Sequence, residues 1–215
     1  MSQKPNNFVF ITGACGFVGG FLVKKLLRET DFKLILNCRS NKIEEEENKR
    51  ILYTSVDLQN KNEMHSMFLQ HKPDRIIHLA AMARLGEGEK FPDEAFRTNV
   101  LATNNLILLA AKYDVITLLY ISSDLARPPV SVVGITKYLT EAAIQNIFFQ
   151  NINLITLRLP NVSFSPGSVH LIFERQIREG KPLTITHPAM TRRFISGEEA
   201  ADFILYALTF GKNKD

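Results

Sequence analysis

Three glycines stand at a regular spacing near the start of the chain, within the stretch TGACGFVG at positions 12–19. Gly13, Gly16 and Gly19 form a G-x-x-G-x-x-G pattern that follows a short apolar run and precedes an amphipathic one. Glycine permits a tight turn and lets backbone N–H groups approach a pyrophosphate, and a helix that starts there adds partial positive charge. The pattern predicts a dinucleotide-binding loop that opens a βαβ unit, with a purely structural turn as the alternative.

The residue that follows the next apolar run, 33–38, bears on which dinucleotide could bind. A site that prefers NAD usually has an acidic residue here, which accepts from the ribose 2′-hydroxyl group. This chain has Arg39, whose guanidinium suits a 2′-phosphate. We therefore predict NADP as the cofactor, with NAD, or a solvated arginine without a ligand, as alternatives. Asp57 follows the third apolar run, where it could accept from the adenine amino group or equally cap a turn or helix.

Cysteines and histidines show no spacing typical of a metal site, and none is predicted. Cys15 and Cys38 lie in different segments, so we expect reduced thiols at both positions. His78 lies in an apolar run and is expected to be a hydrogen-bonded core residue rather than a base. The other histidines considered, expected at the surface or in packing, are His65, His71, His170 and His187.

Short apolar runs alternate with longer amphipathic ones along the chain. The runs expected to form strands are 8–11, 33–38, 51–56, 75–80, 115–122, 153–159 and a short one near 183–186. The segments expected to form helices are 17–29, 61–70, 94–113, 133–149, 168–179 and 198–208, and residues 82–93 are expected to form a loop. This alternation predicts an α/β fold, a Rossmann-like doubly wound parallel sheet with helices on both faces.

The composition agrees with a globular chain that builds a substantial core. The chain has 215 residues, 45% hydrophobic and 22% charged, with 26 basic and 22 acidic side chains. These values exclude a disordered, collagenous or disulfide-stapled class. The basic residues are scattered, so no nucleic-acid partner is expected. No apolar run approaches the ~20 residues that span a bilayer, and the polar start MSQKPNN is no signal peptide, so we expect a cytoplasmic protein.

Later motifs complete a resemblance to a known superfamily. HLAA at 78–81, TNV at 98–100, YISSD at 120–124 and GITK at 134–137 follow the glycine loop in this order, and THPAMTR spans 186–192. The chain resembles the extended short-chain dehydrogenase/reductases, the NAD-dependent epimerases and dehydratases. Within them it resembles the polysaccharide-biosynthesis branch of UDP-N-acetylhexosamine 4,6-dehydratases and epimerases, and the resemblance covers nearly the whole chain.

The resemblance implies a nucleotide-sugar epimerase or dehydratase in which a nicotinamide takes hydride from sugar C4 and returns it. Lys137 would hold the nicotinamide ribose and lower the pKa of a neighbouring acid, and Ser123 would hydrogen-bond the sugar 4-oxygen. Asp124 would aid departure of the C6 hydroxyl, and Asn99 would support the active-site helix and its water. The implied cofactor contacts are Gly13, Cys15, Gly16, Phe17, Val18, Gly19, Arg39, Asp57, Leu58, Leu79, Ala80, Ala81, Asn99, Ser122 and Lys137. The implied substrate contacts are Arg84, Asn161, Ser168 and Arg192.

Four positions depart from the family's pattern. Leu125 replaces a lysine that handles protons, and Val133 occupies the position of the catalytic tyrosine. Ala83 and Pro166 replace a lysine and an arginine. None of these side chains transfers a proton or binds a phosphate. Two alternatives therefore stay open: an NADP-binding sensor or scaffold without turnover, and an NADPH-dependent reductase of another small carbonyl substrate.

The resemblance also implies an organisation. Residues 1–160 would form the NAD(P)-binding Rossmann domain, and 161–215 a small, shortened C-terminal substrate lobe packed on it. The helices expected at 94–113 and 133–149 would pair with a second copy in a homodimer, and burial within one copy is the equal alternative.

Overall fold

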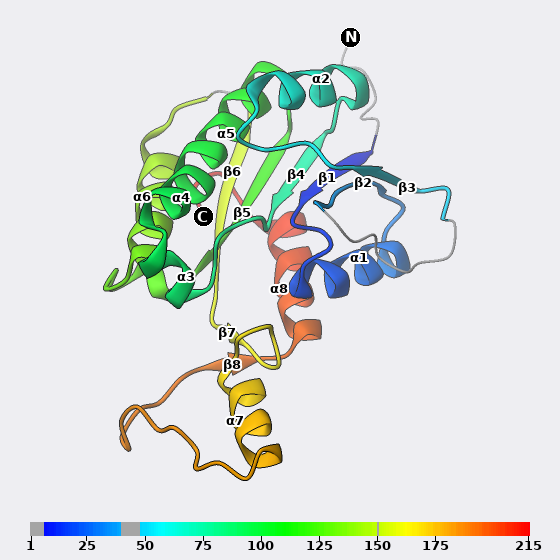
Figure 1. Cartoon of the computed structure of the whole chain (residues 1–215). Helices are drawn as coiled ribbons and strands as arrows, with labels where there is room; N and C mark the ends of the chain where they lie inside the picture. Colours follow the sequence, from blue (N-terminus) through cyan, green and yellow to red (C-terminus); the bar gives the residue numbers. More distant parts are fainter. Residues whose placement is uncertain (1–6, 40–47, 150) are drawn as a thin grey trace.

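The computed structural model describes residues 7–39, 48–149 and 151–215. Six parallel strands form its central sheet in the order β3-β2-β1-β4-β5-β6 (Figure 1). Their bounds are β1 Phe8–Thr12, β2 Lys33–Asn37, β3 Ile51–Thr54, β4 Arg75–His78, β5 Thr117–Ser123 and β6 Asn153–Leu159. The order reverses between β1 and β4, so the fold is the predicted doubly wound one, and ligands of such sheets bind at that reversal.

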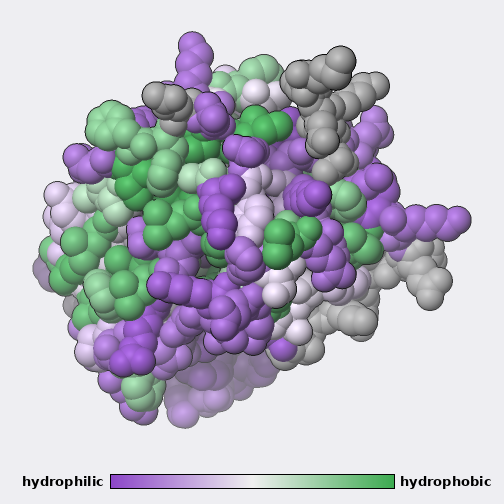
Figure 2. Space-filling model, turned by 90° about the horizontal axis from the view of Figure 1, so that it is seen from above, coloured by the Kyte–Doolittle hydropathy of each residue, from purple (hydrophilic) through white to green (hydrophobic). Residues whose placement is uncertain are grey.

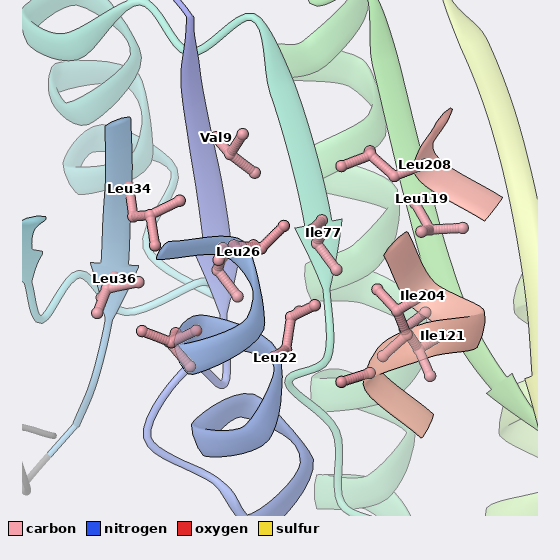
Figure 3. Packing of buried hydrophobic residues seen from close by; sticks show 14 of the residues in the cluster. Val9, Leu22, Leu26, Leu34, Leu36, Ile77, Leu119, Ile121, Ile204 and Leu208 are labelled. Carbon is pink, nitrogen blue, oxygen red and sulfur yellow. The ribbon is translucent and has the colours of Figure 1, made fainter. Parts of the chain in front are cut away.

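Helices cover both faces of the sheet because successive side chains of a strand point to opposite faces. Val9 and Ile11 of β1 face a core that includes α1 (Phe17–Glu29) and α8 (Gly197–Phe210), as Figure 3 shows. Phe10, between them, belongs to the core on the other face. The helices packed there are α2 (Lys61–His71), α5 (Ala102–Lys112) and α6 (Val132–Asn146).

The loop expected at 82–93 is wrong, because α3 (Leu85–Lys90) forms within it and α4 (Pro92–Phe96) begins before its end. Gly86 and Gly88 suggested a loop, yet Gly88 is buried where a Cβ atom would lie 2.6 Å from Val133 Cγ2. Glycine is thus used here for close helix packing. The expected helix at 94–113 is present as α4, a π-helical turn η1 (Arg97–Leu101) and α5.

The strand expected near 183–186 is also wrong. Those residues form no strand, and Leu183 and Ile185 are exposed. Instead the Gln176 side chain of α7 (Val169–Arg178) bonds the Thr184 backbone N–H and hydroxyl, which holds the segment without a neighbouring strand. The second sheet pairs β7 (Asn161–Val162) with β8 (Phe194–Ile195) in parallel.

The C-terminal residues do not all stay beside this second sheet. Figure 1 shows β7, β8 and α7 beyond one end of the main sheet, from which α8 runs back toward it. Ala200, Ile204 and Leu208 of α8 then join the core of the main sheet. The division at residue 160 stays a prediction. Among the described residues, no helix combines the length and apolar character needed to cross a membrane.

Candidate functional site: a cavity at the carboxyl ends of the strands

A cavity of about 330 Å³ opens where β1, β2 and β4 end. Parallel strands bring their carboxyl ends to one edge, so residues far apart in sequence meet there. Nine residues predicted to touch the cofactor line this cavity: Gly13, Cys15, Gly16, Arg39, Asp57, Leu58, Leu79, Ala80 and Ala81. The lining residues that the sequence did not single out for this role are Asn37, Cys38, Val56, Gln59, Thr98 and Ala102.

The glycine loop forms one wall of the cavity and requires its glycines. Gly13 has φ +69°, and a Cβ atom there would lie 2.8 Å from the Ala80 backbone nitrogen. Gly16 N–H donates to the Gly13 carbonyl at 3.0 Å, which closes the turn. α1 then begins after Gly16 with no side chain capping its N-terminus and no acidic residue in its first turn. The wall is therefore suited to an anion such as a diphosphate.

A second wall of the cavity is formed by residues that follow β2 and β3. Arg39 is exposed and lines the cavity, as does Asp57. One Asp57 carboxylate oxygen accepts from the Gln59 backbone N–H at 2.9 Å, a local turn that the sequence kept open as an alternative. Asn37 holds this wall together by donating to the Val56 carbonyl at 3.1 Å. The cavity lining thus combines the glycine loop with a cation and a carboxylate.

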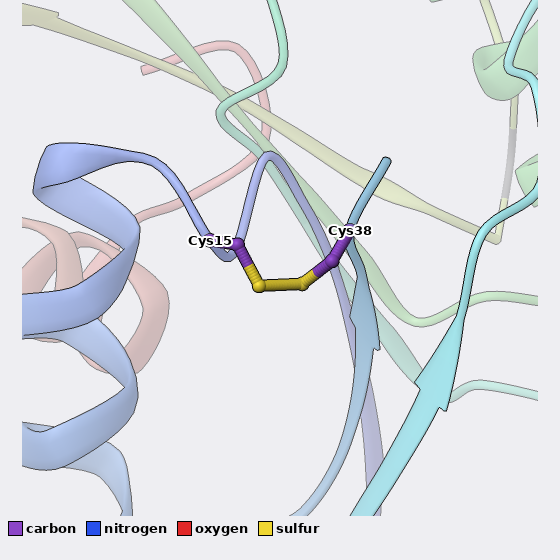
Figure 4. The surroundings of a disulfide bond; sticks show 2 residues. All are labelled: Cys15 and Cys38. Atoms are coloured by element: carbon purple, nitrogen blue, oxygen red, sulfur yellow. A yellow bond between two sulfur atoms is a disulfide. The ribbon is translucent and has the colours of Figure 1, made fainter. Parts of the chain in front are cut away.

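The expectation of two reduced cysteines is wrong for this structure, in which a disulfide joins Cys15 to Cys38 (Figure 4). The pairing of β1 with β2 explains their proximity. Thr12 lies opposite Asn37 in the register, so the residues just beyond both strands meet at the same edge. The Cα atoms of the two cysteines are 5.5 Å apart, which is within the usual range for a disulfide.

Phe17, Val18 and Gly19, also predicted to touch the cofactor, do not line the cavity in this structure. Phe17 stacks edge-on against Phe21, and Val18 packs against the core under α1. Gly19 is buried where a Cβ atom would overlap the Ala14 carbonyl oxygen. These three residues set the position of α1 against the loop.

Ser123 and Asp124 stand at the carboxyl end of β5. The Ser123 hydroxyl donates to an Asp124 carboxylate oxygen at 3.1 Å and accepts from the Leu125 backbone N–H at 3.3 Å. The Asp124 side chain is exposed. A hydroxyl and a solvent-accessible carboxylate in contact can orient an oxygen and move a proton.

Lys137 is buried behind this pair. Its ammonium donates to the Ile121 carbonyl at 2.8 Å and lies 4.8 Å from the centre of the Tyr120 ring. Burial lowers the pKa of Lys137 to about 8, against the opposing effect of Glu141. Lys137 and the neighbouring Ser122 are both buried in this structure rather than part of the cavity wall.

Asn99 lies in the π-helical turn and ties three segments together. Its amide oxygen accepts from Met82 N–H at 2.8 Å, and its amide nitrogen donates to the Met82 carbonyl and the Thr136 hydroxyl. Its carbonyl accepts from the hydroxyls of Thr103 and Thr140. Asn99 therefore holds the segment after β4 against α6, and a π-helical turn of this kind is frequent at functional sites.

Of the four positions that the resemblance marked as departures, Val133 lies at the start of α6 and Leu125 lies in the neighbouring turn η2. Val133 is buried against Gly88 of α3. Gly134 approaches η2 (Asp124–Ala126) so closely that a Cβ atom would overlap the Leu125 carbonyl. The first turn of α6 is thus wedged between α3 and η2.

The four predicted substrate contacts lie apart from the cavity lining. Arg84 pairs with Glu87 at 2.7 Å, and its Nε lies 4.0 Å from the position of a Cβ on Gly167. Asn161, on β7, donates to the Arg193 carbonyl at 3.3 Å, and Ser168 precedes α7. Arg192 is exposed and donates to the Thr191 carbonyl. No group of three or more possible metal ligands occurs in the part of the chain that is described.

Comparison with known proteins gives this arrangement a family context. The model of a family described as "Polysaccharide biosynthesis protein" matches residues 9–215. The capsular polysaccharide biosynthesis protein CapD of Staphylococcus aureus is 34% identical over 217 residues, which cover 95% of this chain and 36% of that protein. A UDP-glucose 4-epimerase of Rickettsia canadensis is 32% identical over 220 residues, or 96% of this chain and 64% of the enzyme.

A solved structure shares the fold closely. The X-ray structure of Pen from Bacillus thuringiensis superimposes with a TM-score of 0.87 and 27% identity, covering 96% of this chain and 66% of that one. The chain therefore spans between about a third and two thirds of the length of these relatives.

Proposed function

The chain belongs to the polysaccharide biosynthesis protein family, and from that premise we propose that it is an NAD(P)-dependent epimerase or dehydratase of nucleotide-linked sugars. The observation that carries the proposal is the cavity at the ends of β1, β2 and β4. It combines an uncapped helix N-terminus with a glycine loop on one wall and Arg39 on the other. A site of this build fits a dinucleotide at the point where the strand order reverses.

The residues present fit the cofactor in named positions. The backbone N–H groups that follow Gly16 would hold the diphosphate, and Arg39 would pair with a 2′-phosphate, which favours NADP over NAD. Asp57 would accept from the adenine amino group through the carboxylate oxygen that Gln59 does not use. When bound, the nicotinamide supplies hydride transfer to and from sugar C4.

The chain's own groups would then manage oxygen and proton positions. Ser123 would donate to the sugar 4-oxygen once its hydroxyl turns from Asp124. Asp124, exposed beside it, would donate a proton to the departing C6 hydroxyl, which then leaves as water. Lys137 would place a positive charge behind Ser123 and Asp124. Asn99 would keep α6 in place through its hydrogen bond to Thr136.

The nucleotide-sugar would lie toward the β7–α7–β8 segment. Arg192 suits its diphosphate, and Asn161, Ser168 and Arg84 would complete the contacts. We assign a UDP-sugar as the substrate class, because the UDP-glucose 4-epimerase named above is a relative.

Two measurements test the proposal. In a fluorescence titration, the protein in excess reductant should bind NADPH more tightly than NADH. Arg39→Gln should weaken NADPH binding about tenfold or more while changing NADH binding little. Arg28→Gln, at an exposed arginine outside the cavity, is the matched control and should change neither. Incubation with UDP-N-acetylglucosamine and the oxidised coenzyme NADP+ should then yield a 4-keto or C4-inverted product, detected by mass spectrometry and NMR. Absence of binding to either coenzyme contradicts the proposal.

Val133 and Leu125 favour a second candidate, an NADP-binding relative without turnover. Neither side chain can carry the proton that the family's tyrosine and lysine carry. Tight NADPH binding with no turnover of UDP-N-acetylglucosamine would support this candidate. The variant Leu125→Lys separates the active enzyme from the inactive relative further. Dehydratase activity gained by this variant would show that the site lacks only the lysine at position 125.

A further inference from the structure

Two of the residues that line the cavity, Cys15 and Cys38, are joined by a disulfide, a bond that the proposed function does not use. We propose that Cys15 and Cys38 are a thiol–disulfide exchange site that controls this cavity: the dithiol form admits the dinucleotide, and the disulfide form excludes it. This inference rests on the proposed function, since it concerns the same cavity.

The place of the disulfide carries the argument. Cys15 belongs to the glycine loop, whose amides suit the diphosphate, and Cys38 directly precedes Arg39, which suits the 2′-phosphate. The adenosine ribose links those two groups of the cofactor, so it must pass between the loop and the end of β2. The disulfide spans that same interval (Figure 4).

The disulfide also fixes the two walls to each other. The loop turns back through the Gly16 to Gly13 hydrogen bond, and β2 is held in the sheet by its pairing with β1 and β3. With the sulfur atoms bonded, the Cα atoms stay 5.5 Å apart and the loop cannot move away from β2 to receive a ribose. Two thiols can rotate independently, so reduction frees both the space and the loop.

The two sulfur atoms differ in access, which sets the order of exchange. Cys38 is only 9% exposed, whereas Cys15 is partly open to solvent and lies two residues before Phe17, at which α1 starts. An incoming thiolate attacks the Cys15 sulfur, the S–S bond breaks, and Cys38 leaves as the thiolate and takes up a proton. The N-terminus of α1 favours negative charge on the Cys15 sulfur, and so favours Cys15 as the thiolate that leaves in the second exchange.

A second thiol then displaces Cys15 from the mixed disulfide. The sum is protein disulfide plus two thiols giving two protein thiols plus one small disulfide, in which the protein gains two electrons and two protons. Oxidation runs the same steps backward, with a small-molecule disulfide such as oxidised glutathione as the oxidant.

The test compares one protein in two redox states. The full chain is equilibrated with excess dithiothreitol or with oxidised glutathione, and free thiols are counted by alkylation and mass spectrometry. Each sample, freed of reagent, is titrated with NADPH by fluorescence. In the reduced sample we expect both cysteines to be alkylated and NADPH to bind. In the oxidised sample we expect no alkylated cysteine and an NADPH affinity about tenfold or more weaker. Reduction of the oxidised sample should restore NADPH binding.

Cys38→Ser is the matched control, because it cannot form the bond. The ratio of its affinities after the two treatments should stay near one, provided that any mixed disulfide on Cys15 is removed before titration. Equal NADPH affinity of the oxidised and reduced wild type would overturn the control of the cavity by the disulfide and leave the proposed function standing. If no disulfide reagent forms the Cys15–Cys38 bond in the wild type, the proposed control of the cavity is overturned as well. Lack of NADPH and NADH binding in the reduced wild type would instead overturn the proposed function.

Discussion

At the scale of single residues, His78 occupies the centre of a chain of hydrogen bonds between the glycine loop and α5. The Thr103 hydroxyl donates to the Asn99 carbonyl, so its oxygen accepts from His78 Nε2 at 2.8 Å. His78 Nδ1 then accepts from the Thr12 hydroxyl at 2.6 Å, and Thr12 accepts from the Ala80 N–H. The chain requires a neutral imidazole with its proton on Nε2.

The neutral state of His78 predicts a pH dependence of stability. Burial lowers the pKa of His78 from 6.5 to about 3, and the positive charge of Lys137 acts in the same direction. Between these values the unfolded chain binds the proton and the folded chain does not, so the free energy of unfolding falls as the pH drops below 6.5. At pH 4 the loss due to His78 should be about 3 kcal/mol.

Urea unfolding at pH 7 and pH 4 measures that loss. His78→Gln should show a smaller fall over this range than the wild type, whatever its stability at pH 7. His187→Gln, at an exposed histidine, should fall as the wild type does. An equal fall in the free energy of unfolding between pH 7 and pH 4 in His78→Gln and wild type would contradict the assignment of this pH dependence to His78.

Val133 stands where the resemblance implies a catalytic tyrosine, and its packing shows why a tyrosine does not fit there. Its side chain fills the space against Gly88, so Val133→Tyr must displace α3 or the start of α6. Overpacking of this kind costs roughly 1–3 kcal/mol. We expect denaturant unfolding at a lower midpoint and no gain of turnover, while Val130→Tyr at an exposed position should leave the midpoint nearly unchanged. If Val133→Tyr gained activity and kept the stability of the wild type, α3 would have to shift at little energetic cost, which would contradict this prediction.

At the scale of elements, α8 closes one face of the sheet although it follows the β7–α7–β8 segment in the chain. Ile204 is fully buried among residues of the main core, and Gly197 meets the ring of Phe21 in α1. Ile204→Ala should therefore lower the free energy of unfolding by about 2–5 kcal/mol. Phe203→Ala, at the exposed neighbour, should cost far less, and equal losses would mean that α8 does not pack as described.

The elements that the sequence predicted are those with a strong local pattern. The apolar run of β1, the spacing of Leu22 and Leu26 in α1, and the fold order follow from periodicity alone. Periodicity and residue type did not predict the segments 82–93 and 183–186 correctly. In the first, Gly88 serves close helix packing instead of breaking a helix. In the second, Leu183 and Ile185 are exposed and pair with no strand.

The candidate site divides in the same way. Gly13, Gly16 and Arg39 could be located from residue type and place after a strand, and the structure puts all three around one cavity. The pairing of Cys15 with Cys38 was missed because cysteine spacing along the chain carries no register. The signal that was available is spatial: both cysteines come just after neighbouring parallel strands.

At the scale of the whole molecule, large apolar side chains are exposed on the helices away from the sheet. Leu108 of α5 and Ile135 and Leu139 of α6 are each more than 40% exposed. In Figure 2, hydrophobic residues gather on the left, the side where Figure 1 places α5 and α6. Burying such a surface is favourable, and a two-fold symmetric pairing of these helices would cover it in both copies.

The predicted homodimer through these helices is tested by mass in solution. Ile135→Glu combined with Leu139→Glu would place charges in that interface, and sedimentation should show a dimer for the wild type and a monomer for the double variant. Ile177→Glu lies on α7, where its side chain is also exposed, and should leave the dimer intact. A wild type that sediments as a monomer at every concentration would contradict the pairing. Because α6 also carries Lys137 and packs on Asn99, loss of the dimer should weaken the hold on the proposed catalytic residues and lower turnover of the UDP-sugar more than NADPH affinity.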